Sequence, residues 1–397
     1  MKIVYFSYLY DIKGISAGSA NKALGFLGGL RRLGHDVRLY WRESQPEAYE
    51  GNSIRLRVRR RLKDRLSKYV HDPKTILKNC FFYIEDCEIL RRERPDLLFL
   101  RSELYNVSAQ LAARRLGIPV VLEADCPTAY EHRHLSSFDM AALPVLPEWT
   151  ERWNCKACRA VITISDVLKN HLVQSGVPAS KITVVPNGAD PDVFRPLPGA
   201  DLVRRRLGIP KRAVVIGWMQ SGWGLSGIQT WISVARRILE SRDEAVFMFI
   251  GGGKNQETLE RAFSGGLMGR RVFCTGTVPY EEVPSYVNVM DIVTVQYPKS
   301  ELWYPSSMKL FECMAAQKAV VASEVPQVDR VIRDGWNGFL FTQDDLDGFA
   351  GKVLRLVDSP GLRRKFAANA RKTVLESYTW TGQARKMEAV FRDVLAR

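Results

Sequence analysis

The feature that most constrains the fold is a regular alternation of short apolar runs with longer helical patterns along nearly the whole chain. Strands buried on both faces of a parallel sheet read as continuous apolar runs, and helices cover the two faces. The pattern therefore predicts an α/β chain with two doubly wound, Rossmann-like parallel sheets. The expected strands are 3–8, 36–40, 97–100, 120–123, 160–164 and 182–185 in the first set, and 213–218, 245–250, 272–275, 292–295, 319–322 and 338–341 in the second.

The length of 397 residues also favours two domains, because single hydrophobic cores usually stop growing at roughly 250 to 300 residues. Residues 187–210 hold four prolines and three glycines and separate the two sets of strands. We therefore predict an N-terminal domain over 1–190 and a C-terminal domain over 191–377. A final helical segment over 378–397 is expected to pack back on the N-terminal domain.

The seven cysteines have no disulfide-framework spacing, so reduced thiols are expected. Cys155 and Cys158 have the spacing of half a zinc site or of a redox pair, but no second pair completes it, and the alternative is packing beside strand 160–164. No apolar run approaches the ~20 residues that span a bilayer. The segment 1–6 resembles a first strand rather than a leader, which predicts a cytoplasmic protein.

The net charge of +15 is concentrated in one place, because residues 51–78 contain ten Lys and Arg against two Asp. Over 55–69 these cations interleave with apolar residues, which is typical of a basic amphipathic segment on an anionic membrane surface. The alternative is a solvated face beside a flexible loop. No nucleic-acid recognition motif accompanies the charge, so we expect no nucleic-acid partner.

Ligands of open parallel sheets bind in the loops that follow the carboxyl ends of strands. In the first domain, Gly18 and Ser19 follow the first strand and begin a helix, where small residues let a backbone approach phosphate or sugar. The spacing is not that of the dinucleotide fingerprint. Arg101 and Glu103 follow the third strand and are predicted to line a ligand-binding side.

In the second domain, the most informative loop leads into the helix that begins near residue 308. The free amides of Ser306, Ser307 and Met308 would face an anion, and Lys309 adds a cation. Glu312, one turn along, can accept hydrogen bonds from ribose hydroxyls, or it merely caps a helix turn. Two further turns provide Gly252 and Val278 as donor-binding candidates, with a nucleotide base held by backbone groups near Val278.

Several motifs occur in an order that resembles a known family. They are residues 34–37, 162–165, 184–190, 194–196, 309–316, 320–323 and 334–339. Together they resemble the GT-B retaining nucleotide-sugar glycosyltransferases of group 1, the family 4-like type. The resemblance runs from the first strand to Trp380, with Ala17-Gly18-Ser19 at the position of the family's paired-glycine loop.

The resemblance implies two domains that face each other across a cleft, with the nucleotide-sugar donor on the second and a hydroxyl acceptor entering from the first. It implies transfer with retention of configuration and with neither metal nor cofactor. Asp125 stands where relatives carry His or Asn, and Glu131 matches a Glu of some relatives, so both join Lys309 as catalytic candidates. The alternatives are a loop cap at Asp125 and simple exposure at Glu131. The resemblance also places Arg101 and Glu103 on the acceptor side, and Ser221 and Gly222 in the loop that binds the donor diphosphate.

The chain departs from the family pattern at three positions. Tyr304 replaces the first of two glutamates, and Trp218 and Ser226 replace an Arg and a Lys that grip the diphosphate. These departures leave two alternatives open, a non-catalytic scaffold of the same fold and a nucleotide-sugar epimerase or hydrolase. The sequence does not determine the base, the sugar or the acceptor, although the basic segment favours a lipid-linked or anionic acceptor.

Overall fold

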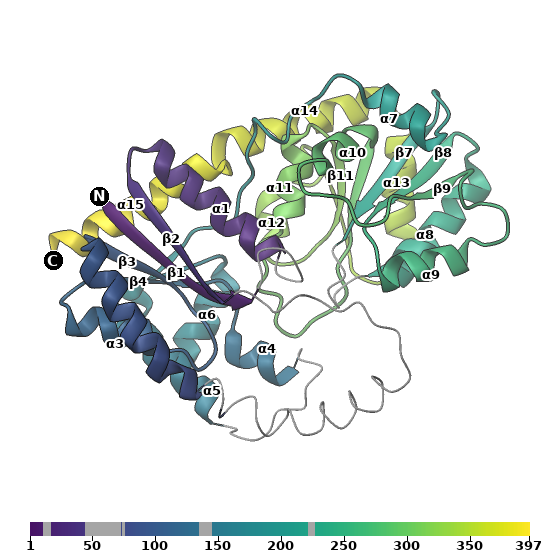
Figure 1. The fold of residues 1–397 in the computed structure, drawn as a ribbon. Helices are drawn as coiled ribbons and strands as arrows, with labels where there is room; N and C mark the ends of the chain where they lie inside the picture. Colours follow the sequence, from purple (N-terminus) through teal and green to yellow (C-terminus); the bar gives the residue numbers. More distant parts are fainter. Residues whose placement is uncertain (11–16, 44–72, 74–75, 135–144, 221–226) are drawn as a thin grey trace, which may run out of the picture. The chain divides into compact units, whose positions relative to one another are not determined.

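The computed structural model describes residues 1–10, 17–43, 73, 76–134, 145–220 and 227–397. The chain divides into two compact units (Figure 1). Unit 1 comprises Met1–Pro186 and Thr381–Arg397, and unit 2 comprises Asn187–Trp380. Each unit contains a six-stranded parallel sheet with helices on its faces, which confirms the predicted fold class.

Unit 1 is built around a sheet with the strand order β2-β1-β3-β4-β5-β6. Its strands are β1 (Lys2–Tyr10), β2 (Asp36–Glu43), β3 (Leu97–Arg101), β4 (Val120–Ala124), β5 (Ala160–Thr163) and β6 (Ile182–Val184). Its helices are α1 (Ala17–Arg32), a helix over 76–93, α3 (Ser108–Arg115), α4 (Thr128–His134), α5 (Leu146–Ala157), α6 (Asp166–Gln174), the 3-10 turn η1 (Ala179–Lys181) and α15 (Trp380–Ala396).

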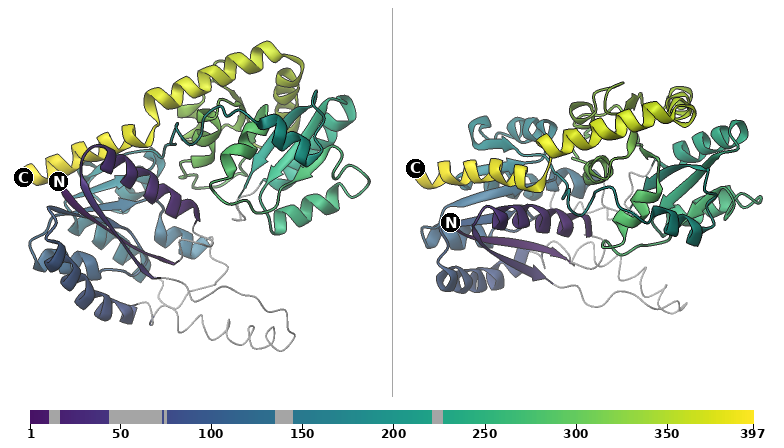
Figure 2. Two further views of the ribbon diagram at one scale, coloured as in Figure 1. Left: turned by 45° about the horizontal axis from the view of Figure 1, so that its top comes forward. Right: turned by 90° about the horizontal axis from the view of Figure 1, so that it is seen from above.

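Helices α1 and α15 lie on one face of this sheet (Figure 2), where an aromatic cluster holds them. Tyr5 of β1 lies against Phe26 of α1 with ring centroids 5.6 Å apart, and Phe99 of β3 lies 5.2 Å from Phe391 of α15. Successive side chains of a strand point to opposite faces. Tyr8 accordingly contacts Phe82 of the helix over 76–93 on the other face. The last helix therefore completes the core of unit 1.

Unit 2 is built around a sheet with the strand order β12-β11-β10-β7-β8-β9. Its strands are β7 (Val214–Met219), β8 (Ala245–Ile250), β9 (Val272–Cys274), β10 (Ile292–Val295), β11 (Ala319–Ser323) and β12 (Phe339–Phe341). Its helices are α7 (Ala200–Leu207), α8 (Ile228–Ser241), α9 (Lys254–Ala262), α10 (Val283–Val289), α11 (Met308–Ala315), α12 (Val328–Val331), α13 (Leu346–Asp358) and α14 (Pro360–Ser377).

Strand β8 illustrates why the strands could be predicted. All six of its residues are buried, and alternate residues enter different cores. Val246 and Met248 join the cluster that includes α11, whereas Phe247 and Phe249 join the cluster that includes α8 and α13. Burial on both faces makes the strand an unbroken apolar run. All twelve predicted strands are confirmed, with ends that differ by a few residues at most.

The strand orders also indicate where ligands bind. An open α/β sheet binds its ligand outside the carboxyl ends of the strands, where the strand order reverses direction. In unit 1 this point lies between β1 and β3, and in unit 2 it lies between β7 and β10. None of the helices within the described ranges is long and apolar enough to cross a membrane.

Candidate functional site

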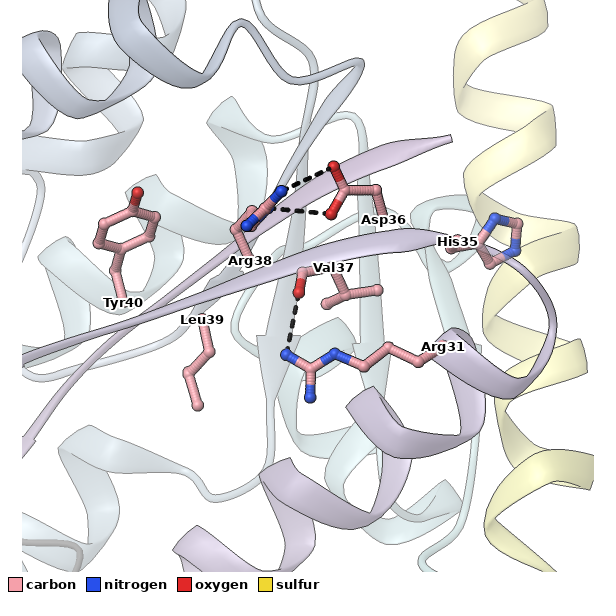
Figure 3. Close-up of a pocket in the computed structure, with 7 residues that line it drawn as sticks. All are labelled: Arg31, His35, Asp36, Val37, Arg38, Leu39 and Tyr40. Carbon is pink, nitrogen blue, oxygen red and sulfur yellow. Dashed lines mark hydrogen bonds and ion pairs between the residues drawn. The ribbon is translucent and has the colours of Figure 1, made fainter.

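An open surface pocket lies beside the edge strand β2 (Figure 3), but it contains none of the predicted site residues. It is lined by Arg31, His35 and the residues from Asp36 to Tyr40. Arg31 donates to the carbonyl of Val37 at 2.9 Å, and Arg38 pairs with Asp36. The guanidinium groups are thus bonded within the pocket, and the predicted site residues lie instead at the carboxyl ends of the strands.

In unit 1, the loops after β3 and β4 bring together Arg101, Glu103 and Asp125. Nη2 of Arg101 lies 2.9 Å from Oδ2 of Asp125, and Nε of Arg101 lies 3.2 Å from Oε1 of Glu103. Nη2 also lies 3.4 Å from the hydroxyl of Ser19, close to the start of α1. The structure thus gathers four residues that the sequence predicted in three different roles: Ser19 in donor binding, Arg101 and Glu103 on the acceptor side, and Asp125 in catalysis.

Two further side chains complete this polar cluster, and the sequence analysis missed both. Lys22 of α1 places Nζ 2.5 Å from Oε1 of Glu123 and 3.3 Å from Oδ2 of Asp125. Glu123 is the penultimate residue of β4 and is buried. The available signal was a charged residue at a core-facing helix position, since Lys22 precedes the buried Phe26 by one turn.

Burial and the neighbouring cations together shift the pKa values of Asp125 and Glu103 in opposite directions. Burial would raise the pKa of Asp125, but the charges of Arg101 and Lys22 hold it below its ordinary value. Burial raises the pKa of Glu103 to about 8, although the charge of Arg101 opposes the shift. At neutral pH the cluster therefore contains an ionised Asp125 beside a protonated Glu103.

Two buried atoms of the cluster have neither a hydrogen bond nor an ion pair among the described residues. Oδ1 of Asp125 and Nη1 of Arg101 are shielded from solvent and make no hydrogen bond in the described structure. Unpaired buried polar groups are costly, and they are found where a ligand completes the bonding. A hydroxyl group can donate to a carboxylate oxygen and accept from a guanidinium N–H at once. The cluster therefore has the polarity to bind a hydroxyl.

The remaining predictions for unit 1 lie around this cluster. Glu131 lies on α4, partly buried, and its charge contributes to raising the pKa of Glu103. Gly18 is exposed in the first turn of α1. Cys155 and Cys158 are both buried, and the Cys158 thiol donates to the Cys155 carbonyl at 3.2 Å, as expected for packing residues.

In unit 2, the turn into α11 brings together four of the predicted donor-binding residues with Lys309. Nζ of Lys309 donates to the amide oxygen Oε1 of Gln220 at 2.6 Å. Gln220 follows β7 directly, so the pair marks the point where the strand order reverses. One turn along α11, Glu312 is buried and accepts a hydrogen bond of 3.0 Å from the hydroxyl of Tyr280.

Desolvation shifts both charged groups of this helix toward their neutral forms. It lowers the pKa of Lys309 to about 8, against the charge of Glu312. It raises the pKa of Glu312 to about 7, against the hydrogen bond from Tyr280 and the charge of Lys309. The partner of the ammonium is thus a neutral amide oxygen, which cannot offset the lost hydration as an anion would.

The segment that leaves β6 fixes the start of α11. The backbone N–H of Asn187 donates to the hydroxyl of Ser306 at 3.0 Å, and its side-chain amide donates to the Ser306 carbonyl at 2.7 Å. Ser307 is the N-cap of α11, and Met308 is its first residue. A side-chain N-cap and two anchoring bonds thus hold this turn with its first amides at the helix end.

Other predicted donor-binding residues lie on neighbouring turns. Gly252 follows β8 and packs so closely that a Cβ there would lie 2.5 Å from the Thr277 hydroxyl. Val278 follows β9 and is partly buried against the core that includes α11. Gln296, which follows β10, is buried beside Gly227 at the start of α8, and its amide has no hydrogen-bond partner among the described residues. Ser221 and Gly222 lie outside the described residues.

The departures from the family pattern have a structural explanation at two of three positions. Trp218 is 3% exposed and packs between Trp231 and Phe249 in the core, so it does not face a ligand. Tyr304 is buried as well, and Ser226 lies outside the described residues. Across the described ranges, no three His, Cys, Asp or Glu side chains are grouped so that they could hold a metal ion.

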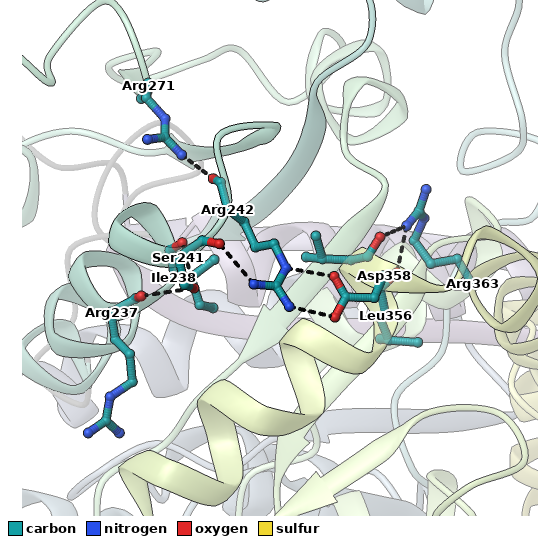
Figure 4. A network of polar contacts seen from close by, with 9 residues as sticks. Arg237, Ile238, Ser241, Arg242, Arg271, Leu356, Asp358 and Arg363 are labelled. Atoms are coloured by element: carbon teal, nitrogen blue, oxygen red, sulfur yellow. Dashed lines mark hydrogen bonds and ion pairs between the residues drawn. The ribbon is translucent and has the colours of Figure 1, made fainter.

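A polar network at the other end of unit 2 serves structure alone (Figure 4). Arg242 follows the end of α8 and makes two bonds, of 2.8 and 2.9 Å, to Asp358 at the end of α13. Arg271 bonds to the Arg242 carbonyl and to that of Leu239. Because α8 returns from the carboxyl edge of the sheet, its end lies at the opposite edge from Lys309.

Comparison with known proteins agrees with these observations. The family model described as Glycosyltransferase Family 4 matches residues 18–193, and the model described as Glycosyl transferases group 1 matches residues 210–359. Alpha-D-kanosaminyltransferase of Streptomyces kanamyceticus is 23% identical over 72% of this chain and 73% of its own. An Escherichia coli UDP-Gal:alpha-D-GlcNAc-diphosphoundecaprenol alpha-1,3-galactosyltransferase is 20% identical over 81% of each chain.

Solved structures share the fold over the full length. A glycosyltransferase from Rickettsia africae superposes with a TM-score of 0.72 at 16% identity, covering 99% of this chain and 98% of its own. Anabaena HepE, in complex with UDP and glucose, superposes with a TM-score of 0.69 at 15% identity, covering 99% and 100%. The chain therefore belongs to the group 1 glycosyltransferases and has the GT-B fold.

Proposed function

We propose that this glycosyltransferase moves a sugar from a nucleotide-sugar donor to a hydroxyl acceptor, with retention of configuration and without a metal ion. The observation that carries the proposal is the arrangement of Lys309 and Glu312 on the first turns of α11. Their side chains combine a cation bonded to a neutral amide with a carboxylate that can accept from ribose. HepE, which shares the fold, has been solved with UDP-glucose.

The donor diphosphate is proposed to bind at the N-terminal end of α11. Breaking the anomeric bond leaves negative charge on the diphosphate, so groups aimed at that charge stabilise the transition state. The amides near Ser306, Ser307 and Met308 and the ammonium of Lys309 supply such groups. Lys309 would exchange the Gln220 amide for the diphosphate. The Lys and Arg that relatives place after β7 would then be unnecessary.

The acceptor is proposed to bind at the polar cluster of unit 1. Oδ1 of Asp125 would accept a hydrogen bond from the acceptor hydroxyl, and Nη1 of Arg101 would donate to its oxygen. With retention, the hydroxyl attacks from the face that the diphosphate leaves, and the leaving phosphate takes the proton. Asp125 then orients the hydroxyl, and Glu131 on α4 adds negative charge near it. Neither carboxylate forms a covalent bond with the sugar.

We also propose that the acceptor is lipid-linked and that the protein associates with an anionic membrane surface. The basic segment 55–69 lies outside the described residues, but the helix over 76–93 follows it directly. Leu77, Phe81 and Ile84 of this helix are 65%, 76% and 61% exposed and share one face. The name of the Escherichia coli relative includes a diphosphoundecaprenol acceptor. Co-sedimentation with vesicles that is indifferent to anionic lipid would contradict this proposal.

The decisive experiment measures binding and turnover with the full chain. Calorimetry against UDP, GDP and ADP and their sugars, first with EDTA and then with Mg²⁺, should show metal-independent binding of one base. Turnover should require a hydroxyl acceptor, and NMR of the product should show the anomeric configuration of the donor. Binding of no nucleotide would favour the scaffold. Release of free sugar or of an epimer without acceptor would favour a hydrolase or epimerase.

A further inference from the structure

A buried lysine in unit 1 has no role in the proposed function so far. Lys22 is 5% exposed on α1, and it faces the sheet one turn before the core residue Phe26. Transferring an ammonium group from water into a protein interior is costly unless it is paired. An apolar side chain at this position would avoid that cost. The charge of Lys22 is therefore expected to act on its neighbours.

Lys22 bridges two carboxylates that lie two residues apart. Its ammonium lies 2.5 Å from Oε1 of Glu123 and 3.3 Å from Oδ2 of Asp125. The other oxygen of Glu123 accepts a 2.6 Å hydrogen bond from Tyr5. The ring of Tyr5 is fully buried and is held between Phe26 and Phe99. The ammonium is thus anchored to the rigid core of unit 1 through Glu123.

Both cations of the cluster act on the same oxygen of Asp125. Lys22 and Arg101 approach Oδ2, whereas Oδ1 has no hydrogen-bond partner among the residues that the structure describes. Two cations on one oxygen fix the rotation of the carboxylate and leave the second oxygen for another donor. Arg101 alone would leave the carboxylate with a single cationic contact. Lys22 therefore supplies a second cation that holds the same oxygen.

We propose that Lys22 is a positioning residue that holds Asp125 in one orientation toward the acceptor hydroxyl. The inference rests on the proposed role of Asp125 and deepens it. Asp125 is surrounded by Tyr5 from β1, Arg101 and Glu103 after β3, Glu123 of β4, the adjacent Cys126 and Glu131 of α4. Lys22 of α1 also faces it, and of these described groups Lys22 and Arg101 are the ones whose charges lower the pKa of Asp125.

The test is the variant Lys22→Met, which keeps the length of the side chain and removes its charge. The kcat/KM for the acceptor should fall by about tenfold or more, while the Kd for the donor nucleotide stays unchanged. The acidic limb of the pH profile of kcat/KM should move to higher pH, because the pKa of Asp125 rises when a cation is lost. A purely structural lysine would lower the melting temperature without moving the limb, and that result would overturn the proposal.

Glu123→Gln provides a second test, in which the acidic limb of the pH profile should shift in the opposite direction. It removes a negative charge near Asp125 and leaves Lys22 free to pair with Asp125 alone, so the acidic limb should move to lower pH. The glutamine has nearly the same shape as the glutamate that it replaces, and Lys22 stays in place. This variant can therefore be used where Lys22→Met fails to fold. An acidic limb that stays in place or moves to higher pH would overturn the proposal.

A double-mutant cycle separates failure of this inference from failure of the proposed function. If Lys22 acts through Asp125, Lys22→Met should cost nothing further in an Asp125→Asn background. Independent, additive losses would overturn the positioning role and leave the role of Asp125 intact. If Asp125→Asn alone leaves turnover unchanged, the proposed role of Asp125 fails first. Lys22→Arg restores the charge and should recover part of the activity.

Discussion

The polar clusters of the two units occupy the same place in their sheets and differ in how their charges are balanced. In unit 1, Lys22 and Arg101 are paired with the carboxylates of Glu123 and Asp125, and Arg101 also contacts the protonated Glu103. In unit 2, the ammonium of Lys309 is bonded to the neutral amide of Gln220. The cluster of unit 1, whose cations are already paired with carboxylates, suits a neutral hydroxyl. Lys309, whose ammonium is bonded to a neutral amide, suits a diphosphate. The difference supports the proposal that the acceptor binds to unit 1 and the donor to unit 2.

Among the variants that test this comparison, Lys309→Met should have the largest effect on kcat and on nucleotide binding. Removal of the cation that faces the diphosphate is expected to lower kcat by about 100-fold or more. It should also weaken nucleotide binding, which calorimetry measures directly. The matched control is Lys372→Met, which changes an exposed lysine of α14 that pairs with Glu376. Nucleotide binding within threefold of the unmodified protein would show that Lys309 does not bind the donor.

Glu312→Gln should have a smaller effect that depends on the ligand. A hydrogen bond to a charged group contributes about 1.5 to 3 kcal/mol. The variant should therefore bind a nucleoside diphosphate about 10-fold to 100-fold more weakly. Inorganic diphosphate lacks ribose, so its affinity should stay within about threefold. Equal losses for both ligands would place Glu312 at the diphosphate instead.

The pH dependence of donor binding should be a narrow bell. As pH falls through about 7, Glu312 takes up a proton and can no longer accept two ribose hydrogen bonds. As pH rises through about 8, Lys309 loses its proton and its charge. Donor affinity should be highest between pH 7 and pH 8. At pH values well above 8 it should fall by about tenfold per pH unit. Inorganic diphosphate should show only the alkaline fall, whereas a flat profile would contradict both assignments.

Arg242→Ala should give the smallest effect. This arginine ties the ends of α8 and α13 at the edge of the sheet away from Lys309. Partly exposed ion pairs contribute little to stability. We expect a fall of at most about 4 °C in melting temperature and unchanged kinetic constants. A loss of donor binding would show that the two edges of unit 2 are coupled.

The sequence predicted those parts of the molecule whose cause is local. The strands were predicted because burial on both faces leaves apolar runs such as 245–250. The start of α11 was predicted because its amides, Lys309 and Glu312 lie within seven residues of each other. The contacts of Lys309 with Gln220 and of Tyr5 with Glu123 were not predicted, because they join residues that are 89 and 118 positions apart in the sequence. Only the strand order shows that these residues meet.

The chain passes between the units twice, at Pro186 and again at Trp380. Unit 2 is thus one continuous segment, whereas unit 1 receives its last helix only after all of unit 2 has been made. During synthesis, domains generally fold as units from the N-terminus. Unit 2 can fold while α15 is still inside the ribosome. In unit 1, by contrast, Phe99 is covered by Phe391 only after α15 has been synthesised. The N-terminal half of the chain is therefore the last to finish folding.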